Sequence, residues 1–325
     1  KKKFKNIIGI ETNKLILKKI KKNKSHISHI KNNEIKKLNR NFQISNKLSL
    51  INQVDVVIIC LPTPLNKSLS PNMSYISNCI YKIKNYLKPD QLLILESTVY
   101  PGATNELIVK KIKKKFDVGK NFFVGYSPER EDPGNKMSAS AQMTKLVSGK
   151  TKNCLELTKK LYSSVFKNIW SLSNIETCEM TKLYENIYRS VNIGMANEMK
   201  IICSGLNMDV YEIIRAAKTK PFGFNAFYPG PGLGGHCIPI DPLFLTWIAK
   251  KNKLSTKFIS LSNKINREMP NYIYKKFLKV KKKLEKFNIL IVGIAYKKNI
   301  DDTRESPALK FMDLLTKDKI KFKYY

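Results

Sequence analysis

Short, unbroken apolar runs recur through the first part of this 325-residue chain, and VDVVIICLPTP (54–64) and LLILEST (92–98) are the clearest. A strand that is apolar throughout buries both of its faces, which is typical of a parallel sheet covered by helices on each side. Ser74 to Leu87 and residues 105–116 have helical spacing between such runs. Because strands and helices alternate, the sequence predicts an α/β fold with a doubly wound, Rossmann-like sheet.

Ligands collect at the carboxyl ends of the strands in a sheet of this kind. The first expected strand, residues 4–11, ends in an acidic residue, in the position where a nucleotide-binding sheet holds a ribose. The polar side chains expected at this edge are Glu11, Thr63, Ser97, Thr98 and Glu129. The strand and G-x-G-x-x-G turn that precede the acidic residue in such sheets are absent here. We therefore expect that the strand which normally begins such a sheet, ahead of residues 4–11, is missing, and that both ends of the chain are cut.

The pattern changes at Glu176, where a segment without proline carries apolar residues at helical spacing as far as Leu206. About 30 residues form a helix of about 45 Å, long enough to bridge domains or to pack against a second subunit. Lys182 and Asn186 are four residues apart and face the same way. Taken alone, that pair is more typical of an exposed helix face than of a functional site.

The segment from Phe227 to Leu245 holds four glycines and three prolines before Asp241, which excludes a regular helix or strand. Cys237 lies in this irregular turn, as expected of an accessible nucleophile. The alternative is a tight loop with an incidental cysteine. The other five cysteines are scattered without CxxC pairs and are expected to be reduced thiols, and three histidines are too few to indicate a metal site.

A second strand–helix pattern begins at Phe287, with a strand at 287–296, a helix at 307–318 and a terminal strand at 320–325. One such unit cannot cover both faces of a sheet, so we expect the start of a second, incomplete Rossmann-like domain. The predicted domains are a dinucleotide-binding domain at 1–175, a helical domain at 176–275 and an α/β domain at 276–325.

The formal net charge of +35 raises the question of nucleic-acid binding. Only six of the 60 basic residues are arginine, and the lysines are spread over most segments, so we disfavour that function. The longest apolar runs are far too short to cross a bilayer, and no signal peptide is evident. The sequence predicts a cytoplasmic protein whose positive field favours an anionic substrate.

Six segments in this order resemble the UDP-glucose/GDP-mannose dehydrogenase family. They are CLPTPL (60–65), ESTVYPG (96–102), YSPEREDPGN (126–135), EMTKLYENIYRSVNIGMANE (179–198), GPGLGGHCIPIDP (230–242) and GIAYKKNIDDTRESPAL (293–309). The resemblance implies NAD as the cofactor, a UDP-binding C-terminal domain and a homodimer formed through the central helix. It implies four-electron oxidation of a sugar C6 alcohol to a carboxylate, with a product that feeds surface-polysaccharide synthesis.

The resemblance also assigns roles to residues. Cys237 would form a thiohemiacetal and then a thioester, while Lys182 and Asn186 would stabilise the oxyanion. Asp241 and Thr98 would hold a water, and Glu129 would assist proton transfer during hydrolysis. The implied NAD site comprises Glu11, Pro62, Thr63, Ser97 and Thr98. The implied substrate site comprises Glu129, Arg130, Lys182, Asn186, Phe227, Gly234, Tyr296 and Lys297.

Within the family, EREDPGN (129–135) and KSHISHI (24–30) are most similar to enzymes that act on UDP-N-acetylhexosamines. UDP-N-acetylglucosamine is the favoured substrate, while UDP-N-acetylmannosamine, a UDP-galactose-type sugar and UDP-glucose stay open. A different class of function is also open. Because the NAD glycine turn is absent, the chain could be a non-catalytic protein that binds sugar nucleotides or dimerises.

Overall fold

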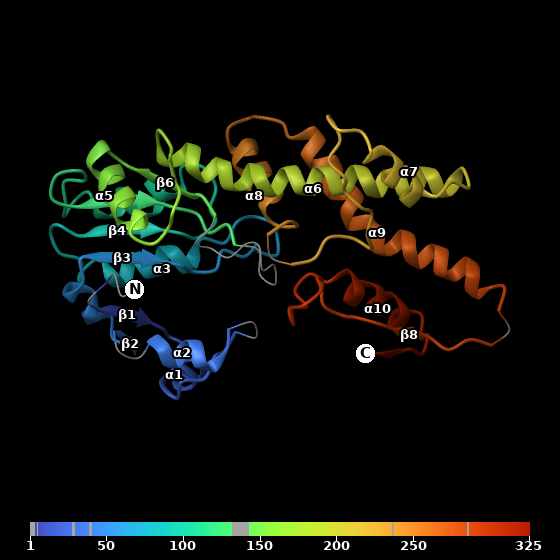
Figure 1. Cartoon of the computed structure of the whole chain (residues 1–325), viewed down its shortest axis with the longest axis horizontal. Helices are drawn as coiled ribbons and strands as arrows, with labels where there is room; N and C mark the ends of the chain where they lie inside the picture. The colour runs from blue at the N-terminus through green and yellow to red at the C-terminus, as the bar shows by residue number, and fades with distance from the viewer. Residues whose placement is uncertain are drawn as a thin grey trace. The chain divides into compact units, whose positions relative to one another are not determined.

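The structure is a computed structural model of the chain, and it divides into two compact units (Figure 1). The first unit comprises residues 1–64 and 72–182, and the second comprises 65–71 and 183–325. The residues described are 4, 6–27, 30–38, 41–131, 143–235, 237–284 and 286–325. In these ranges no helix is both long enough and apolar enough to cross a membrane.

The first unit contains a five-stranded sheet in which the strands lie in sequence order. They are β3 (Val56–Ile59), β4 (Leu92–Leu95), β5 (Phe123–Tyr126), β6 (Lys145–Gly149) and β7 (Ile169–Ser171). The first three strands pair in parallel, β6 is antiparallel to β5, and β7 is parallel to β6. The prediction of an α/β sheet is confirmed. The sheet mixes parallel and antiparallel pairs, which is common in large sheets.

Both faces of this sheet are covered, as the unbroken apolar runs predict. Leu92 and Ile94 of β4 pack against α5 (Lys152–Ser163). Their neighbours Leu93 and Leu95 point to the opposite face and are also 0% exposed. Figure 1 shows α3 (Ser74–Ile83), which buries three isoleucines, and α5 against the sheet.

Two glycines let α5 approach the sheet closely. A Cβ on Gly149 would lie 2.1 Å from the backbone nitrogen of Leu155, and a Cβ on Gly125 would lie 2.3 Å from Thr158 Oγ1. Larger residues at either strand position would therefore push the helix away. The Gly125–Gly149 pairing fixes where β5 and β6 meet.

A separate parallel pair, β1 (Ile7–Ile10) and β2 (Phe42–Ser45), completes the strands of the first unit. The short helices α1 (Lys14–Lys21) and α2 (Asn32–Leu38) connect them. Ile7 of β1 and Ile58 of β3 are each 44% exposed, although strands of a doubly wound sheet are normally buried. Among the described residues no strand pairs with both β1 and β3.

The expected helix at 105–116 is shorter and less regular than the sequence pattern predicts. It consists of a π-turn, η2 (Asn105–Val109), followed by α4 (Lys110–Ile112). A 3-10 turn, η1 (Leu48–Gln53), precedes β3.

The long helix is confirmed as α6 (Ile175–Gly205), with 31 residues. Asn174 Oδ1 accepts a hydrogen bond from the Thr177 amide at its start. At its end, Asn207 has a φ of 56°, and the Met208 amide donates to the Cys203 carbonyl, which forms a Schellman motif. Asp209 then caps α7 (Val210–Ala217), so the helix ends where the sequence changes from apolar to polar.

Two further helices, α8 (Asp241–Lys251) and α9 (Lys257–Lys281), belong to the second unit. Pro270 inside α9 cannot donate a hydrogen bond to the Asn266 carbonyl, which is left without its helical partner. Gly232, with a φ of +131°, approaches this point, because a Cβ there would lie 3.2 Å from that oxygen. The glycine-rich segment therefore packs where the proline interrupts the helix.

The C-terminal part of the chain consists of β8 (Leu290–Ile291), α10 (Pro307–Lys317) and β9 (Lys323–Tyr324). The two strands pair in parallel, as predicted, but each is two residues long instead of six to ten. Their core includes buried residues from α9, α10 and the loop after it, namely Tyr274, Leu315 and Ile320. The Ser306 side chain accepts from the Ala308 amide and begins α10.

Candidate active site

Cys237 lies in the glycine-rich segment, residues 227–245, four residues before α8 begins at Asp241. Its carbonyl accepts hydrogen bonds from the amides of Ile240 at 3.2 Å and Asp241 at 2.9 Å, so the backbone turns into the helix at this residue. The residue is exposed, and its sulfur forms no disulfide with another described cysteine. The structure thus presents the thiol on an irregular turn that a helix supports.

Asp241 joins this turn to the long helix. Asn186 Nδ2 on α6 donates to Asp241 Oδ2 at 2.6 Å, and the two residues are only 6% and 3% exposed. Two residues that the sequence analysis selected separately are therefore in contact. A buried amide–carboxylate bond of this kind fixes the turn that carries Cys237 relative to Asn186.

Tyr296 and Arg304 lie against the same turn. The Gly235 amide donates to the Arg304 carbonyl at 2.8 Å. A Cβ on Gly235 would lie 2.7 Å from the Tyr296 ring, and one on Gly234 would lie 2.3 Å from Tyr296 Cβ. Arg304 is held by a bidentate bond to Asp302, with Nη2 at 2.6 Å from Oδ2. Glycine is thus required at both positions so that the loop after β8 can pack beside Cys237.

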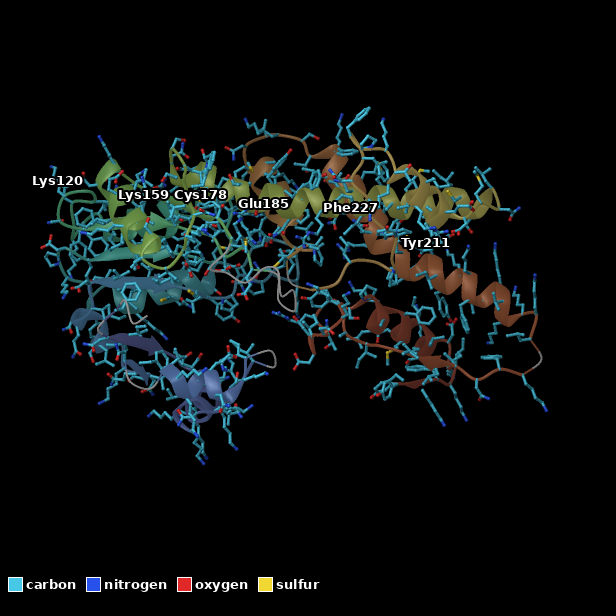
Figure 2. The ribbon with its side chains drawn as sticks, in the orientation of Figure 1. Lys120, Lys159, Cys178, Glu185, Tyr211 and Phe227 are labelled. Carbon is cyan, nitrogen blue, oxygen red and sulfur yellow. The ribbon has the colours of Figure 1, made fainter. Side chains whose placement is uncertain are left out.

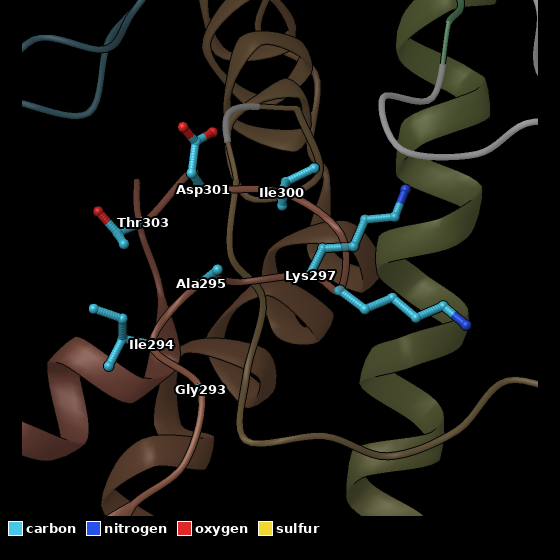
Figure 3. A pocket seen from close by; sticks show the side chains of 8 residues that line it. Gly293, Ile294, Ala295, Lys297, Ile300, Asp301 and Thr303 are labelled. Atoms are coloured by element: carbon cyan, nitrogen blue, oxygen red, sulfur yellow. The ribbon is translucent and has the colours of Figure 1, made fainter. Parts of the chain in front are cut away.

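A hollow of about 440 Å³ lies in this loop, and Figure 3 shows Lys297 extending from one end of it, away from Asp301 and Thr303. The lining residues are Gly293, Ile294, Ala295, Lys297, Lys298, Ile300, Asp301 and Thr303. Two lysines and one aspartate border the hollow, so side chains of both charges lie around it.

A buried polar network that the sequence analysis missed holds the other end of the glycine-rich segment. Asn197 on α6 accepts from the Gly230 amide at 2.9 Å and donates to Asn266 Oδ1 at 2.8 Å. Asn266 Nδ2 donates in turn to the Ser190 carbonyl at 2.9 Å. Both asparagines are at most 1% exposed, so this network ties the segment to α6 and α9. Asn197 lies within the segment 179–198 that resembles the family. Its burial could not be predicted, because polar residues inside a helix are usually exposed.

The predicted cofactor residues lie at the carboxyl ends of β1, β3 and β4 in the first unit. Thr63 is 4% exposed and donates to the Thr98 carbonyl at 2.8 Å. Ser97 Oγ accepts from the Leu61 amide at 2.9 Å, while Pro62 is exposed. Glu11 follows β1, and its Oε1 accepts from the Asn13 amide at 2.7 Å. The turns after β3 and β4 are therefore bonded to each other, whereas Glu11 follows a strand of the separate β1–β2 pair.

Glu129 follows β5 and contacts a buried lysine that sequence reasoning also missed. Its Oε2 lies 3.3 Å from Lys145 Nζ, and its Oε1 accepts from the amides of Arg130 and Glu131. Burial raises the pKa of Glu129, but the Lys145 charge and the two amides outweigh this effect and lower the pKa. Arg130 is engaged elsewhere, because its Nη1 donates to the Thr144 carbonyl at 2.8 Å.

Glu179 ties α6 to the turn that follows Thr98. Its carboxylate accepts from the Gly102 amide at 2.6 Å, and from the amide and hydroxyl of Thr104 at 2.8 and 2.6 Å. The residue is 0% exposed. Burial raises its pKa to about 7, even though all three donors favour the carboxylate form.

The remaining predicted residues lie on or near α6. Lys182 is 8% exposed and lies on α6 between Cys178 and Glu185, which Figure 2 labels. Phe227 packs edge-on against Tyr188 with ring centroids 5.8 Å apart. Parts of two diagnostic segments, residues 28–29 and 132–135, lie outside the described residues.

Three family models match consecutive parts of the chain. The NAD-binding domain of the UDP-glucose/GDP-mannose dehydrogenase family matches residues 1–166, its central domain matches 176–268, and its UDP-binding domain matches 290–325.

Individual relatives agree with these matches. The UDP-N-acetyl-D-mannosamine dehydrogenase of Methanocaldococcus jannaschii is 37% identical over 84% of this chain and 62% of its own length. Protein CapL of Staphylococcus aureus is 34% identical over 95% of this chain and 74% of its own length. Among solved structures, the UDP-D-ManNAc dehydrogenase of Pyrococcus horikoshii has a TM-score of 0.87 at 31% identity and covers 98% of this chain and 77% of that one.

Proposed function

This chain belongs to the UDP-glucose/GDP-mannose dehydrogenase family, and from that premise we propose that it oxidises the C6 alcohol of a UDP-N-acetylhexosamine to a carboxylate. The observation that carries the proposal is the contact between Asn186 and Asp241 at 2.6 Å, beside the exposed Cys237 thiol. It joins an oxyanion donor, a carboxylate and a nucleophile on two adjacent elements.

We propose UDP-N-acetylmannosamine as the substrate. Relatives that are 37% and 31% identical carry its name, which supports this sugar over UDP-N-acetylglucosamine, the choice that the sequence segments alone favoured. UDP-glucose is less well supported, because the UDP-glucose dehydrogenase of Pyrobaculum islandicum is only 20% identical and shows the fold alone.

The proposed chemistry proceeds through a covalent thioester. Two NAD molecules, bound one after the other, would each accept one hydride, the first from the alcohol and the second from the thiohemiacetal. The Cys237 thiolate adds to the aldehyde carbon, and a thiol suits this step because the resulting thioester can be hydrolysed. Lys182 and Asn186 donate to the oxygen on which negative charge develops. Water then displaces the thiolate, with Asp241 and Thr98 holding that water.

The residues of the first unit fit NAD at its adenosine end. Glu11 is an acidic residue at the carboxyl end of a parallel strand, where a carboxylate accepts bonds from ribose hydroxyls. The turns at Pro62, Thr63 and Ser97 would hold the rest of the cofactor. The hydroxyls of Thr63 and Ser97 already brace these turns, so we propose that the turns contribute backbone groups and shape.

We also propose that two copies pair through α6. Apolar side chains recur along one face of the helix, where Tyr184 is 68% exposed, Met195 is 60% exposed and Ile202 is 47% exposed. Sedimentation of Met195→Lys should give half the mass of the unmodified protein, whereas Leu15→Lys, at an exposed site on α1, should not. The six cysteines, all among the described residues, form no disulfide with one another, and we propose a reducing, cytoplasmic location.

The proposed substrate is tested by comparing three UDP-sugars at equal concentration with excess NAD. We expect kcat/KM for UDP-N-acetylmannosamine to exceed the values for UDP-N-acetylglucosamine and UDP-glucose by about tenfold or more, since one misplaced polar group costs at least that much. A preference for UDP-glucose would contradict the substrate assignment. Calorimetric binding of UDP-sugar without NADH formation would instead support a non-catalytic binding protein.

A further inference from the structure

A buried ammonium group lies behind the Glu129 carboxylate. The Lys145 side chain on β6 is only 4% exposed, and its Nζ lies 3.3 Å from Glu129 Oε2 and 3.2 Å from the Pro128 carbonyl. A buried ammonium destabilises the fold unless carboxylates and hydrogen bonds surround it. Lys145 therefore depends on its partners, and it has two carboxylates within reach.

The second carboxylate is Glu96, at the end of β4. Its Oε1 lies 3.2 Å from Lys145 Nζ and accepts from the Tyr162 hydroxyl at 2.5 Å, while its Oε2 accepts from Cys60 Sγ at 3.4 Å. The Glu96 side chain is 16% exposed, whereas that of Glu129 is 49% exposed. Glu96 is thus the internal counter-ion, and Glu129 is the carboxylate that a substrate can reach.

The two Glu129 oxygens are held in different ways. Oε1 accepts from the amides of Arg130 at 2.8 Å and Glu131 at 2.7 Å, and Oε2 faces Lys145. The rings of Tyr162 and Phe166 lie 5.1 and 5.3 Å from the ammonium and close off its other side. Among the described residues, the contacts of the ammonium are therefore these two rings, the Pro128 carbonyl and the two carboxylates.

We infer that Lys145 is the positioning residue for Glu129, and that its buried ammonium keeps this carboxylate ionised and oriented to accept a proton during thioester hydrolysis. The inference rests on the proposed function. In that step water adds to the thioester carbon, its proton passes to Glu129, and the carbon–sulfur bond breaks to release the Cys237 thiolate. No oxidant takes part in the hydrolysis. The positioning of Glu129 therefore affects the hydrolysis of the thioester and not the hydride transfers.

Other groups near Glu129 set the background for its titration. Among the described residues they lie directly after β3 and β4, in the loop after β5, and on α5 and α6. They are Cys60, Glu96, Arg130, Glu131, Tyr162 and Cys178. Burial raises the pKa values of Cys60, Tyr162 and Cys178, so these groups stay neutral near pH 7. Among the described residues, Lys145 is therefore the cation whose side chain contacts the Glu129 carboxylate.

The test replaces the ammonium without leaving an unpaired buried carboxylate. Lys145→Met alone would strand Glu96, so the test variant is Lys145→Met with Glu96→Gln, whose amide oxygen can still accept from Tyr162. Lys145→Arg keeps the charge, and Lys120→Met removes a surface cation that pairs with Asp117 at 2.8 Å. The first readout is the titration of the Glu129 carboxyl carbon by NMR, assigned with Glu129→Gln. The second is the pH dependence of kcat.

In the double variant we expect the Glu129 midpoint to rise by about one pH unit or more, because an opposite charge within about 4 Å is lost. The acidic limb of kcat should move by the same amount while KM changes less than about twofold, and at a pH on that limb kcat should fall about tenfold. Lys145→Arg and Lys120→Met should keep both midpoints.

An unchanged NMR midpoint would overturn the inference whatever the activity. A shifted NMR midpoint with an unshifted kcat limb would also overturn it, because Glu129 would then not act in hydrolysis. If the unmodified protein oxidised no UDP-sugar while the NMR midpoint shifted as expected, the proposed function would fail and the hold of Lys145 on Glu129 would stand.

Discussion

Cys60 and Cys237 are both exposed, yet the surroundings of Cys60 differ from those of Cys237, the proposed nucleophile. Cys60 Sγ donates to Glu96 Oε2 at 3.4 Å. Burial around the sulfur, together with the charge and hydrogen bond of Glu96, raises the pKa of this thiol to about 12. Cys237 lies instead in the turn beside the positively charged Arg304.

This difference predicts selective alkylation. Iodoacetamide at pH 8 should label Cys237 at least about tenfold faster than Cys60, because only the thiolate reacts and the Cys60 thiol is protonated at that pH. Peptide mass spectrometry over a time course measures both rates in one sample. Equal labelling of the two residues would show that the Glu96 contact does not protect Cys60. Glu96→Gln should raise the Cys60 rate.

Individual residues of the site differ in how far the sequence could predict them. Cys237 and Asp241 stand out because glycines and prolines surround them, and Asn186 stands out through its spacing from Lys182. Lys145 gave no signal, since it is one lysine in a chain with 60 basic residues and its partners Glu96 and Glu129 are 49 and 16 residues away. A buried ion pair between distant residues becomes visible only in three dimensions.

At the scale of elements, the side chain of Glu179 links α6 to the turn after β4 through hydrogen bonds. Its pKa in the folded protein, about 7, lies above the ordinary value of 4.5 because burial outweighs its three donors. Between these two pH values the folded state holds a proton that the unfolded chain has already released. The contribution to stability is therefore complete below pH 4.5 and is lost as the pH rises through about 7.

Glu179→Gln tests this link. A shift in the pKa of Glu179 from 4.5 to about 7 changes the free energy of unfolding by about 3 kcal/mol across this pH range. Urea unfolding of the unmodified protein should show this fall between pH 5 and pH 8, and the variant should show a flatter profile. Glu106→Gln, at a carboxylate that accepts from the Tyr100 hydroxyl nearby, is the matched control. Identical pH profiles for Glu179→Gln and the unmodified protein would contradict the account.

The crossing of α6 and α9 makes a second prediction at this scale. A Cβ on Gly194 would lie 2.2 Å from Ser262 Oγ, whereas one on Gly205 of the same helix meets nothing within 4 Å. Gly194→Ala should destabilise the protein by about 1–3 kcal/mol through overpacking. Gly205→Ala should be neutral or stabilising by up to about 1 kcal/mol through helix propensity. Equal midpoints in thermal unfolding would show that the helices separate freely at this point.

Elements with strong local patterns were predictable, and those that depend on pairing were not. The apolar run of β4 and the proline-free α6 are unambiguous. The strand β6 was missed because KLVSG mixes lysine and serine with apolar residues, and its burial comes from antiparallel pairing with β5 and from α5. The strands β8 and β9 are shorter than their apolar runs, since regular pairing stops after two residues.

At the scale of the whole molecule, α6 is the one element among the described helices that belongs to both units. Lys182 and Asn186 lie one turn apart on it, so the helix itself sets the spacing between them. The proposed oxyanion donors therefore keep their spacing whatever else moves. The proposed hydrolytic residues Thr98 and Glu129 belong to the first unit, and Cys237 belongs to the second. The proposed reaction accordingly needs the whole chain.

The most direct test of the thioester proposal is the ratio of NADH formed to UDP-N-acetylmannosamine consumed. The account predicts a ratio of two, with the sugar recovered as its uronic acid, and a Cys237→Ala variant that forms no uronic acid. A ratio of one with an aldehyde product, or a Cys237→Ala variant that still forms two NADH per sugar, would contradict it.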